Sequence, residues 1–80
     1  MYGVEYAPGI ERQIEQLPSE AKRACRAAVE ALRADPWRGQ QYRGHPREFR
    51  TWTFEPWGLI VYVIGERVAR VLVVQVTWAG

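Results

Sequence analysis

The sequence is poor in residues that bind metals or cross-link a chain. Cys25 is the only cysteine among 80 residues, which excludes an internal disulfide and leaves no partner for a zinc site of the CxxC type. A single thiol fits a reducing compartment. The acidic residues do not cluster at metal-ligand spacing, and we expect neither a metal ion nor another cofactor.

Long apolar runs are also missing. The longest apolar stretches fall far short of the about 18 residues that a helix needs to cross a bilayer. The first residues, MYGVEY, have neither the basic nor the apolar region of a secretory signal. These absences predict a cytoplasmic protein that does not enter a membrane.

The composition is typical of a small folded domain. Hydrophobic residues make up 48% of the chain and charged residues 25%, which excludes a disordered tail. The length predicts a single domain over residues 1–80. The net charge is only +2, but five arginines face two acidic residues between positions 33 and 50. Such a basic segment attracts polyanions, although it also fits a solvated surface.

Two helices are predicted in the first half of the chain. Residues 2–6 alternate large apolar with small or charged side chains, which indicates a half-buried strand. The apolar spacing then predicts a short amphipathic helix over about 9–17. A second helix begins after Pro18 and ends at Asp35-Pro36, because a residue before proline is pushed away from helical angles. Its apolar stripe is rich in small residues and should pack closely on the first helix; it consists of Ala21, Ala24, Cys25, Ala28, Val29 and Leu32.

Three strands are predicted in the second half, at about 48–54, 58–64 and 68–78. Residues 55–58 and 65–67 separate them, and both segments have hairpin length. The predicted fold is α+β with the order β-α-α-β-β-β. An N-terminal helical hairpin packs on a four-stranded, mainly antiparallel sheet.

Several short sequence words, taken in order, resemble one family. They are VEYAPGIERQIEQLP, ALRADP, YRGHPREFRTWTF and GLIVYVIGERVARVLVVQV, and together they span nearly the whole chain. This order resembles the RelE/ParE superfamily of bacterial type II toxins. The resemblance implies a toxin that a cognate antitoxin holds inactive. RelE-like members cleave messenger RNA in the ribosomal A site, whereas ParE-like members act on DNA gyrase, and the fold does not decide between them.

The resemblance also implies site residues. RNA cleavage by a ribose 2′-OH needs removal of its proton, protonation of the leaving oxygen and neutralisation of charge on phosphorus. In RelE-like toxins, basic side chains on the open sheet face are expected to do this. Arg50 matches a basic position of the pattern, and its fork suits two phosphate oxygens. Trp52, on the same strand face, stands where several relatives carry a second basic residue.

The chain departs from the family pattern at two expected arginines. Leu59 occupies the arginine position of the R-x-x-Y word, whose tyrosine is retained as Tyr62. The usual arginine near the end falls at about Trp78 or Ala79, and Gly80 is reached before any C-terminal tyrosine. Loss of two phosphate-neutralising side chains would cripple the usual mechanism unless other residues replace them.

The loop before the second-half strands offers replacements. Arg43, His45 and Arg47 lie just upstream of Arg50, and a histidine is a capable general acid or base near neutral pH. We therefore predict Arg50, His45 and Arg47 as catalytic residues, and Arg43, Arg47, Arg50 and Trp52 as RNA-binding residues. The same arginines fit a solvated loop, and the tryptophans fit core packing or burial beneath an antitoxin. Tyr62 shares a strand face with Ile60 and Ile64 and is expected in the core.

Three functions remain open at this point. The first is a RelE-like, metal-free, ribosome-dependent endoribonuclease that cuts messenger RNA and inhibits translation, with a cognate antitoxin as partner. The second is a ParE-like inhibitor of DNA gyrase that binds without cutting RNA. The third is a relative that binds an antitoxin but is not toxic.

Overall fold

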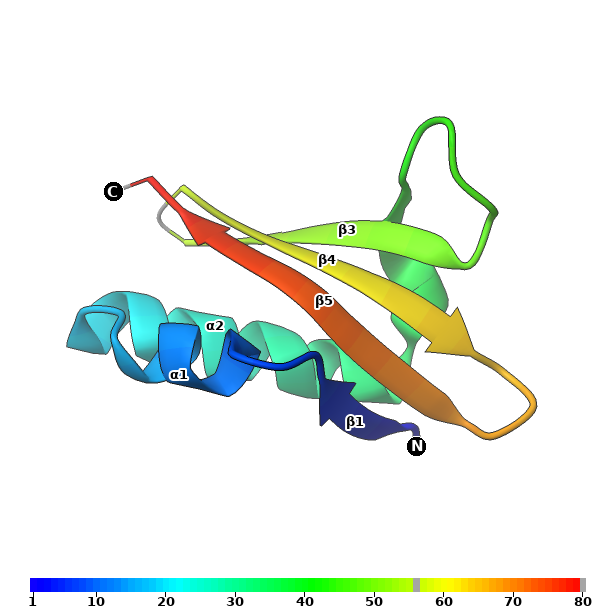
Figure 1. Ribbon diagram of the computed structural model, residues 1–80, viewed down its shortest axis with the longest axis horizontal. Helices are drawn as coiled ribbons and strands as arrows, with labels where there is room; N and C mark the ends of the chain where they lie inside the picture. Colours follow the sequence, from blue (N-terminus) through cyan, green and yellow to red (C-terminus); the bar gives the residue numbers. More distant parts are fainter. Residues whose placement is uncertain (56, 80) are drawn as a thin grey trace.

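The computed structural model describes residues 1–55 and 57–79 and shows two helices packed on one sheet (Figure 1). The elements in chain order are β1 (Gly3–Tyr6), α1 (Ile10–Glu15), α2 (Ser19–Ala34), the 3-10 helix η1 (Pro36–Arg38), β2 (Gln40–Gln41), β3 (Phe49–Phe54), β4 (Gly58–Gly65) and β5 (Arg70–Trp78). The predicted α+β class and the order of the main elements are confirmed.

The sheet has five strands in the order β1-β5-β4-β3-β2, and not the predicted four. β1 runs parallel to β5, and the other neighbours are antiparallel. The fifth strand is β2, whose two glutamines pair with Thr51 and Arg50 at the edge of the sheet. Two polar residues carry no period-2 pattern, so the sequence gives no signal for this strand.

Both helices cover the same face of the sheet, and the opposite face is open (Figure 1). α1 is shorter than predicted, because Gly9 has a left-handed φ of 86° and the helix ends at Glu15. α2 begins at Ser19 and ends at Ala34, as expected from the flanking prolines. Cys25 of α2 is fully buried in the core cluster, which also contains Ile10 and Ile14 of α1.

The core lies between the helices and β4 and β5. Tyr62 and Ile60 are completely buried there, which confirms the strand parity predicted for them. Opposite the step from Val61 to Tyr62, Val74 is an extra residue in β5, because Val61 pairs with Gln75 while Tyr62 pairs with Val73. The irregularity adjusts which side chains of β5 face the helices.

Two hairpin turns were predicted, one on each side of β4. The turn at 55–58 includes Pro56, which lies outside the described residues. The turn after β4 is longer than predicted, since β5 begins at Arg70 and the Ala69 amide donates to the Glu66 carbonyl oxygen at 3.1 Å. No helix within residues 1–55 and 57–79 is long and apolar enough to cross a membrane.

Candidate functional site

The predicted basic residues gather where η1, β2 and β3 meet. In β3, Arg50 lies opposite Tyr62 and Trp52 lies opposite Ile60, and both partners are buried under the helices. Arg50 and Trp52 therefore point toward the helix-covered side of the sheet. This differs from the expectation that basic side chains of the site lie on the open face.

The centre of the open face carries uncharged side chains. Successive side chains of a strand point to opposite faces, so the residues that alternate with the core-facing ones lie on the open face. The central members, paired across β3, β4 and β5, are Thr51, Thr53, Leu59, Val61, Gln75 and Thr77. Leu59 thus brings an apolar side chain to the face where an arginine was expected from the resemblance.

Most of the hydrogen-bond donors of Arg50 bind oxygen atoms of the protein itself. Its Nε donates to the Arg47 carbonyl oxygen at 2.8 Å, and its Nη1 donates to the carbonyl oxygens of Gly39 at 3.0 Å and Trp37 at 3.5 Å. The guanidinium also lies 5.0 Å from the centre of the Trp37 ring. Nη2 makes no hydrogen bond within the described residues and is the donor left for a ligand.

Two tryptophans organise the neighbouring arginines. The Arg47 guanidinium lies 5.0 Å from the centre of the same Trp37 ring, and Arg38 lies 5.5 Å from the ring centre of Trp52. Such cation–π contacts fix a guanidinium while leaving its edge free to donate. Trp37 itself is oriented by its amide, which donates to Asp35 Oδ1 at 3.2 Å at the start of η1.

His45 lies in an aromatic stack on the loop between β2 and β3. Its ring is parallel to that of Tyr42, with centroids 4.5 Å apart and an interplanar angle of 4°, and lies 5.2 Å from the Phe49 ring. Its Nδ1 is 3.2 Å from the Arg43 carbonyl oxygen. Because a carbonyl can only accept, Nδ1 must carry the hydrogen, and Nε2 is left as the reactive nitrogen. Gly44, with φ 81°, permits the tight turn between Tyr42 and His45.

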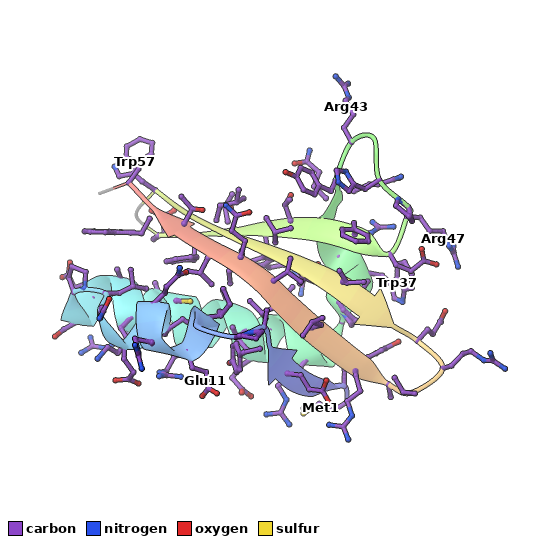
Figure 2. The ribbon with its side chains drawn as sticks, viewed as in Figure 1. Met1, Glu11, Trp37, Arg43, Arg47 and Trp57 are labelled. Carbon is purple, nitrogen blue, oxygen red and sulfur yellow. The ribbon has the colours of Figure 1, made fainter. Side chains whose placement is uncertain are left out.

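The structure therefore brings some of the predicted residues together and separates others. Figure 2 shows Arg43 at the outermost point of this loop, with Arg47 and Trp37 nearer its base. Arg47 and Arg50 share Trp37. His45 packs on Phe49, whose strand parity is that of the open face, whereas Arg50 points to the other face. The three predicted catalytic residues do not converge on one point in this conformation.

Sequence reasoning missed the contribution of η1. A hollow of about 270 Å³ lies at the sheet edge beyond β2; it is lined by Arg38, Gly39, Gln40, Thr51, Trp52 and Thr53. The adjacent Trp37-Arg38 pair was the available signal, an aromatic next to a cation in a short segment between α2 and the sheet. We give the name arginine margin to this hollow together with Trp37, Arg50 and the loop arginines Arg43 and Arg47.

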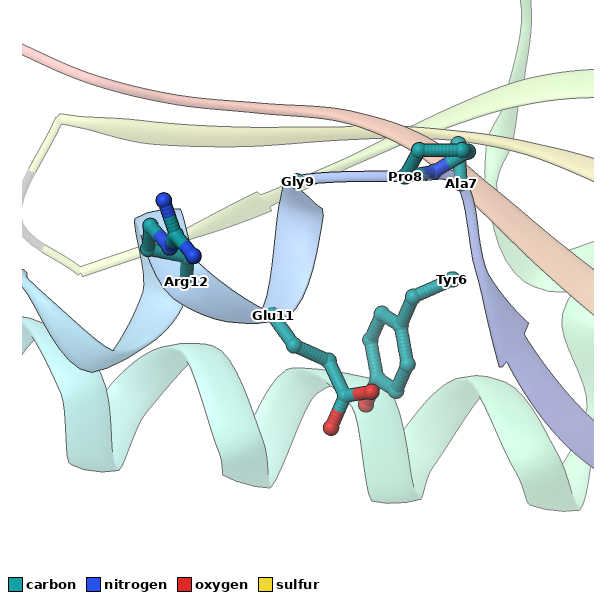
Figure 3. A pocket seen from close by; sticks show the side chains of 6 residues that line it. All are labelled: Tyr6, Ala7, Pro8, Gly9, Glu11 and Arg12. Atoms are coloured by element: carbon teal, nitrogen blue, oxygen red, sulfur yellow. The ribbon is translucent and has the colours of Figure 1, made fainter.

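A second hollow lies elsewhere and shares no residue with the arginine margin. It has a volume of about 440 Å³ and follows the connection from β1 to α1, where Figure 3 shows the Tyr6 ring and Glu11 side by side. Burial raises the pKa of Tyr6, and the nearby Arg26 partly opposes the rise. Within the described residues, no three side chains of His, Cys, Asp or Glu are grouped so that they could hold a metal ion.

Comparison with known proteins shows a likeness in structure. No family model matches the sequence, and no curated protein matches it. The isolated RelE toxin of E. coli has a TM-score of 0.86 at 16% identity, over 100% of this chain and 86% of that one. The intact E. coli RelBE toxin–antitoxin complex matches with a TM-score of 0.84 at 16% identity, over 100% and 99% of the two chains. The RelBE2 toxin–antitoxin complex of Mycobacterium tuberculosis matches at 0.82 and 20% identity, over 98% of both. The chain therefore has the fold of the RelE toxins.

Proposed function

We propose that this chain is the toxin of a type II toxin–antitoxin pair and that it cuts messenger RNA on the ribosome without a metal. The observation that carries the proposal is the RelE fold over the full length of the chain. Matched structures include RelE bound to RelB and RelBE2, which supports a cognate antitoxin as the partner of this chain as well. The site of action would be the bacterial cytoplasm, where ribosomes and message are found.

The arginine margin supports RNA as the substrate. Arg43 and Arg47 are exposed, and the one ion pair in this loop joins Arg47 Nε to Glu48 Oε2 at 3.7 Å, between side chains that remain 69% and 42% exposed. An exposed pair of this kind is weak and leaves the guanidinium available. Arginines attract a phosphate backbone from a distance and bind its oxygens in pairs.

Roles in the cleavage step follow from the loop geometry. Arg47 neutralises charge on the phosphate, and Arg43 holds the flanking backbone. Nε2 of His45 is free to take the proton of the 2′-OH or to donate to the leaving oxygen. For both to act on one phosphate, the loop must bring His45 around the edge of β3 when RNA binds. Trp52, next to Arg38, offers a ring on which a base can stack.

A second candidate function is inhibition of DNA gyrase by binding alone, as in ParE-like toxins. The observation that favours it is the weak catalytic set. Trp52 and Leu59 bring no positive charge to β3 and β4, and most donors of Arg50 are bonded to the backbone. A surface that acts by contact does not need these groups.

The experiment uses the toxin purified with its antitoxin and then freed from it. Ribosome-bound message should be cut in the presence of EDTA, and translation in an extract should stop. Arg47→Gln should lower cleavage by about 10²-fold if it neutralises the transition state. Arg67→Gln, an exposed arginine on the opposite hairpin, is the matched control and should keep full activity.

The alternatives give different outcomes in parallel assays. Intact message together with loss of DNA supercoiling by gyrase would reject the nuclease and support the gyrase inhibitor. If message stays intact, supercoiling is normal and overexpression is harmless, both toxic functions are rejected. The chain would then be a relative that binds an antitoxin but is not toxic. Cleavage that survives both Arg47→Gln and His45→Ala would place the active groups outside this loop.

A further inference from the structure

Two side chains fasten the segment between α2 and β3 to the sheet. Tyr62, fully buried in β4, donates its Oη hydrogen to the Pro36 carbonyl oxygen at 2.6 Å. Its neighbour across the β3–β4 ladder, Arg50, binds the carbonyl oxygens of Trp37, Gly39 and Arg47. Between them they bind η1 at both ends and also the base of the loop that follows β2.

We propose that Arg50 is a positioning residue, whose guanidinium ties η1 and the β2–β3 loop together so that Arg38, Arg43 and Arg47 face a nucleic acid. Its direct role is to bind backbone oxygens of the protein, and contact with phosphate is left to these three neighbours. The consequence for RNA rests on the proposed function. The tie itself does not, because it is a feature of the folded chain alone.

The chemistry of the contact requires an arginine. Three acceptors come from two separate chain segments, and the planar guanidinium reaches them with Nε and Nη1 in a fixed fork. A lysine carries the same charge on one compact ammonium group. It cannot bind acceptors in the Trp37–Gly39 segment and in the loop at the same time. The guanidinium of Arg50 contacts carbonyl oxygens and the Trp37 ring. It forms no ion pair with a carboxylate within the described residues.

The segment has few other ties to the sheet. Beyond β2, the loop is closed by the Tyr42 amide, which donates to the Phe49 carbonyl oxygen at 2.9 Å, and by the Phe49 amide, which donates to Pro46 at 2.9 Å. Neither of these two bonds reaches β4 or β5. One bond at the end of the loop does reach β4, because the Ile64 amide donates to the Glu48 carbonyl oxygen at 3.0 Å. Removal of the Arg50 guanidinium should therefore open this region locally while the core between the helices and β5 stays closed.

Hydrogen exchange of the purified protein tests the tie without any assay of function. The variants are Arg50→Lys, Arg50→Gln and the charge control Arg67→Gln. In both Arg50 variants the amides of Tyr42 and Phe49 should exchange faster by about 10-fold or more, corresponding to loss of at least one net hydrogen bond. Amides of the β5 core should keep wild-type rates, as should every amide of Arg67→Gln. Tyr62→Phe should speed exchange at the Trp37 and Arg38 amides more than at Phe49.

Three results would overturn the proposal. Exchange in Arg50→Lys within about twofold of wild type would show that charge alone suffices. A uniform rise across the β5 core would mean a global loss of stability. Message cleavage lost in Arg50→Gln but restored in Arg50→Lys would make Arg50 a direct phosphate contact. Equal loss of cleavage in both variants, with faster loop exchange, is the result expected. If the wild-type protein cuts nothing, the proposed function fails, and the exchange data still decide the tie.

Discussion

Near the arginine margin, the methyl group that should destabilise the fold most is the one added by Gly39→Ala. Gly39 has φ −66° and ψ 163°, an extended conformation that alanine adopts without strain. A Cβ at this position would nevertheless overlap Tyr62 Oη and would lie 2.8 Å from the Thr51 carbonyl oxygen and 2.9 Å from Tyr62 Cζ. The cost of Gly39→Ala therefore comes from contacts and not from the backbone.

The neighbours of that Cβ have no inexpensive way to move. Tyr62 is fully buried and bonded to Pro36, and the Thr51 oxygen is part of the backbone of β3. Overpacking of this kind costs about 1 to 3 kcal/mol. If the Tyr62 ring shifts, the orphaned Pro36 carbonyl adds about 1 to 3 kcal/mol. In a domain of this size each kcal/mol lowers Tm by about 4 to 8 °C. We expect a fall in Tm of at least about 8 °C, from a loss near 2 kcal/mol.

Thermal and urea denaturation of four variants, Gly39→Ala, Tyr62→Phe, the double variant of these two and Gly44→Ala, make the test specific. Gly44→Ala is the matched control, because Gly44 has φ 81° but nothing lies within 4 Å of its added Cβ. It should lose only about 1 kcal/mol of backbone strain energy. In the pair Gly39→Ala and Tyr62→Phe, removal of the hydroxyl relieves the worst overlap, so the double variant should lose less than the two single losses together. A Gly39→Ala variant as stable as Gly44→Ala would refute the reasoning.

Three further predictions concern the turn after β4 and two titrating groups. Ala69 has φ 53°, so Ala69→Gly should raise the free energy of unfolding by about 0.5 to 1 kcal/mol, seen as a higher urea midpoint; an unchanged midpoint would contradict it. Burial raises the pKa of Tyr62 from 10.0 to about 12, so the fold favours the neutral phenol, and this stability is complete below pH 10 and lost as pH rises toward 12. Alkaline melts of Tyr62→Phe should therefore fall less steeply over that range than those of wild type, and parallel curves would reject the assignment. The hydrogen bond from Lys22 holds the pKa of Glu15 below its usual 4.5, so its contribution exists above that pH and disappears on acidification; Glu15→Gln should flatten the acid limb, and an unaltered limb would exclude this pair as the cause.

The main elements of the fold could be read from the sequence because their patterns are strong and local. The alternating residues of β1 and the β-branched run of β5 give strand signals, and the proline-flanked α2 gives clear helix ends. β2 was not predicted because its two residues pair only when the neighbouring segments are already in place. Its pairing depends on tertiary contacts, which local propensity cannot report.

The site was harder to predict than the fold because its acceptors are backbone atoms. Arg50 was predicted to be a catalytic and RNA-binding residue, and that role stays a prediction; its partners in the structure are carbonyl oxygens at positions 37, 39 and 47. Every residue type offers a carbonyl, so no sequence pattern marks these partners. The loop contacts of His45 are similar, since its Nδ1 binds the oxygen of Arg43 and not a side chain.

The face on which a strand residue lies now separates the competing mechanisms. Strand parity with the buried Tyr62 directs Arg50 to the helix-covered side, while Leu59 and its neighbours leave the centre of the open face uncharged. A phosphate at the centre of that face would find no cation beside it. Arg70 shares the face but lies at the start of β5 and pairs with Glu5 at 3.7 Å, so the charge would have to come from the β2–β3 loop. If this chain cuts RNA as proposed, cleavage should depend on Arg43, His45 and Arg47. Toxicity that persists without these three side chains, while message stays intact, would show that the chain acts by contact and not by cutting.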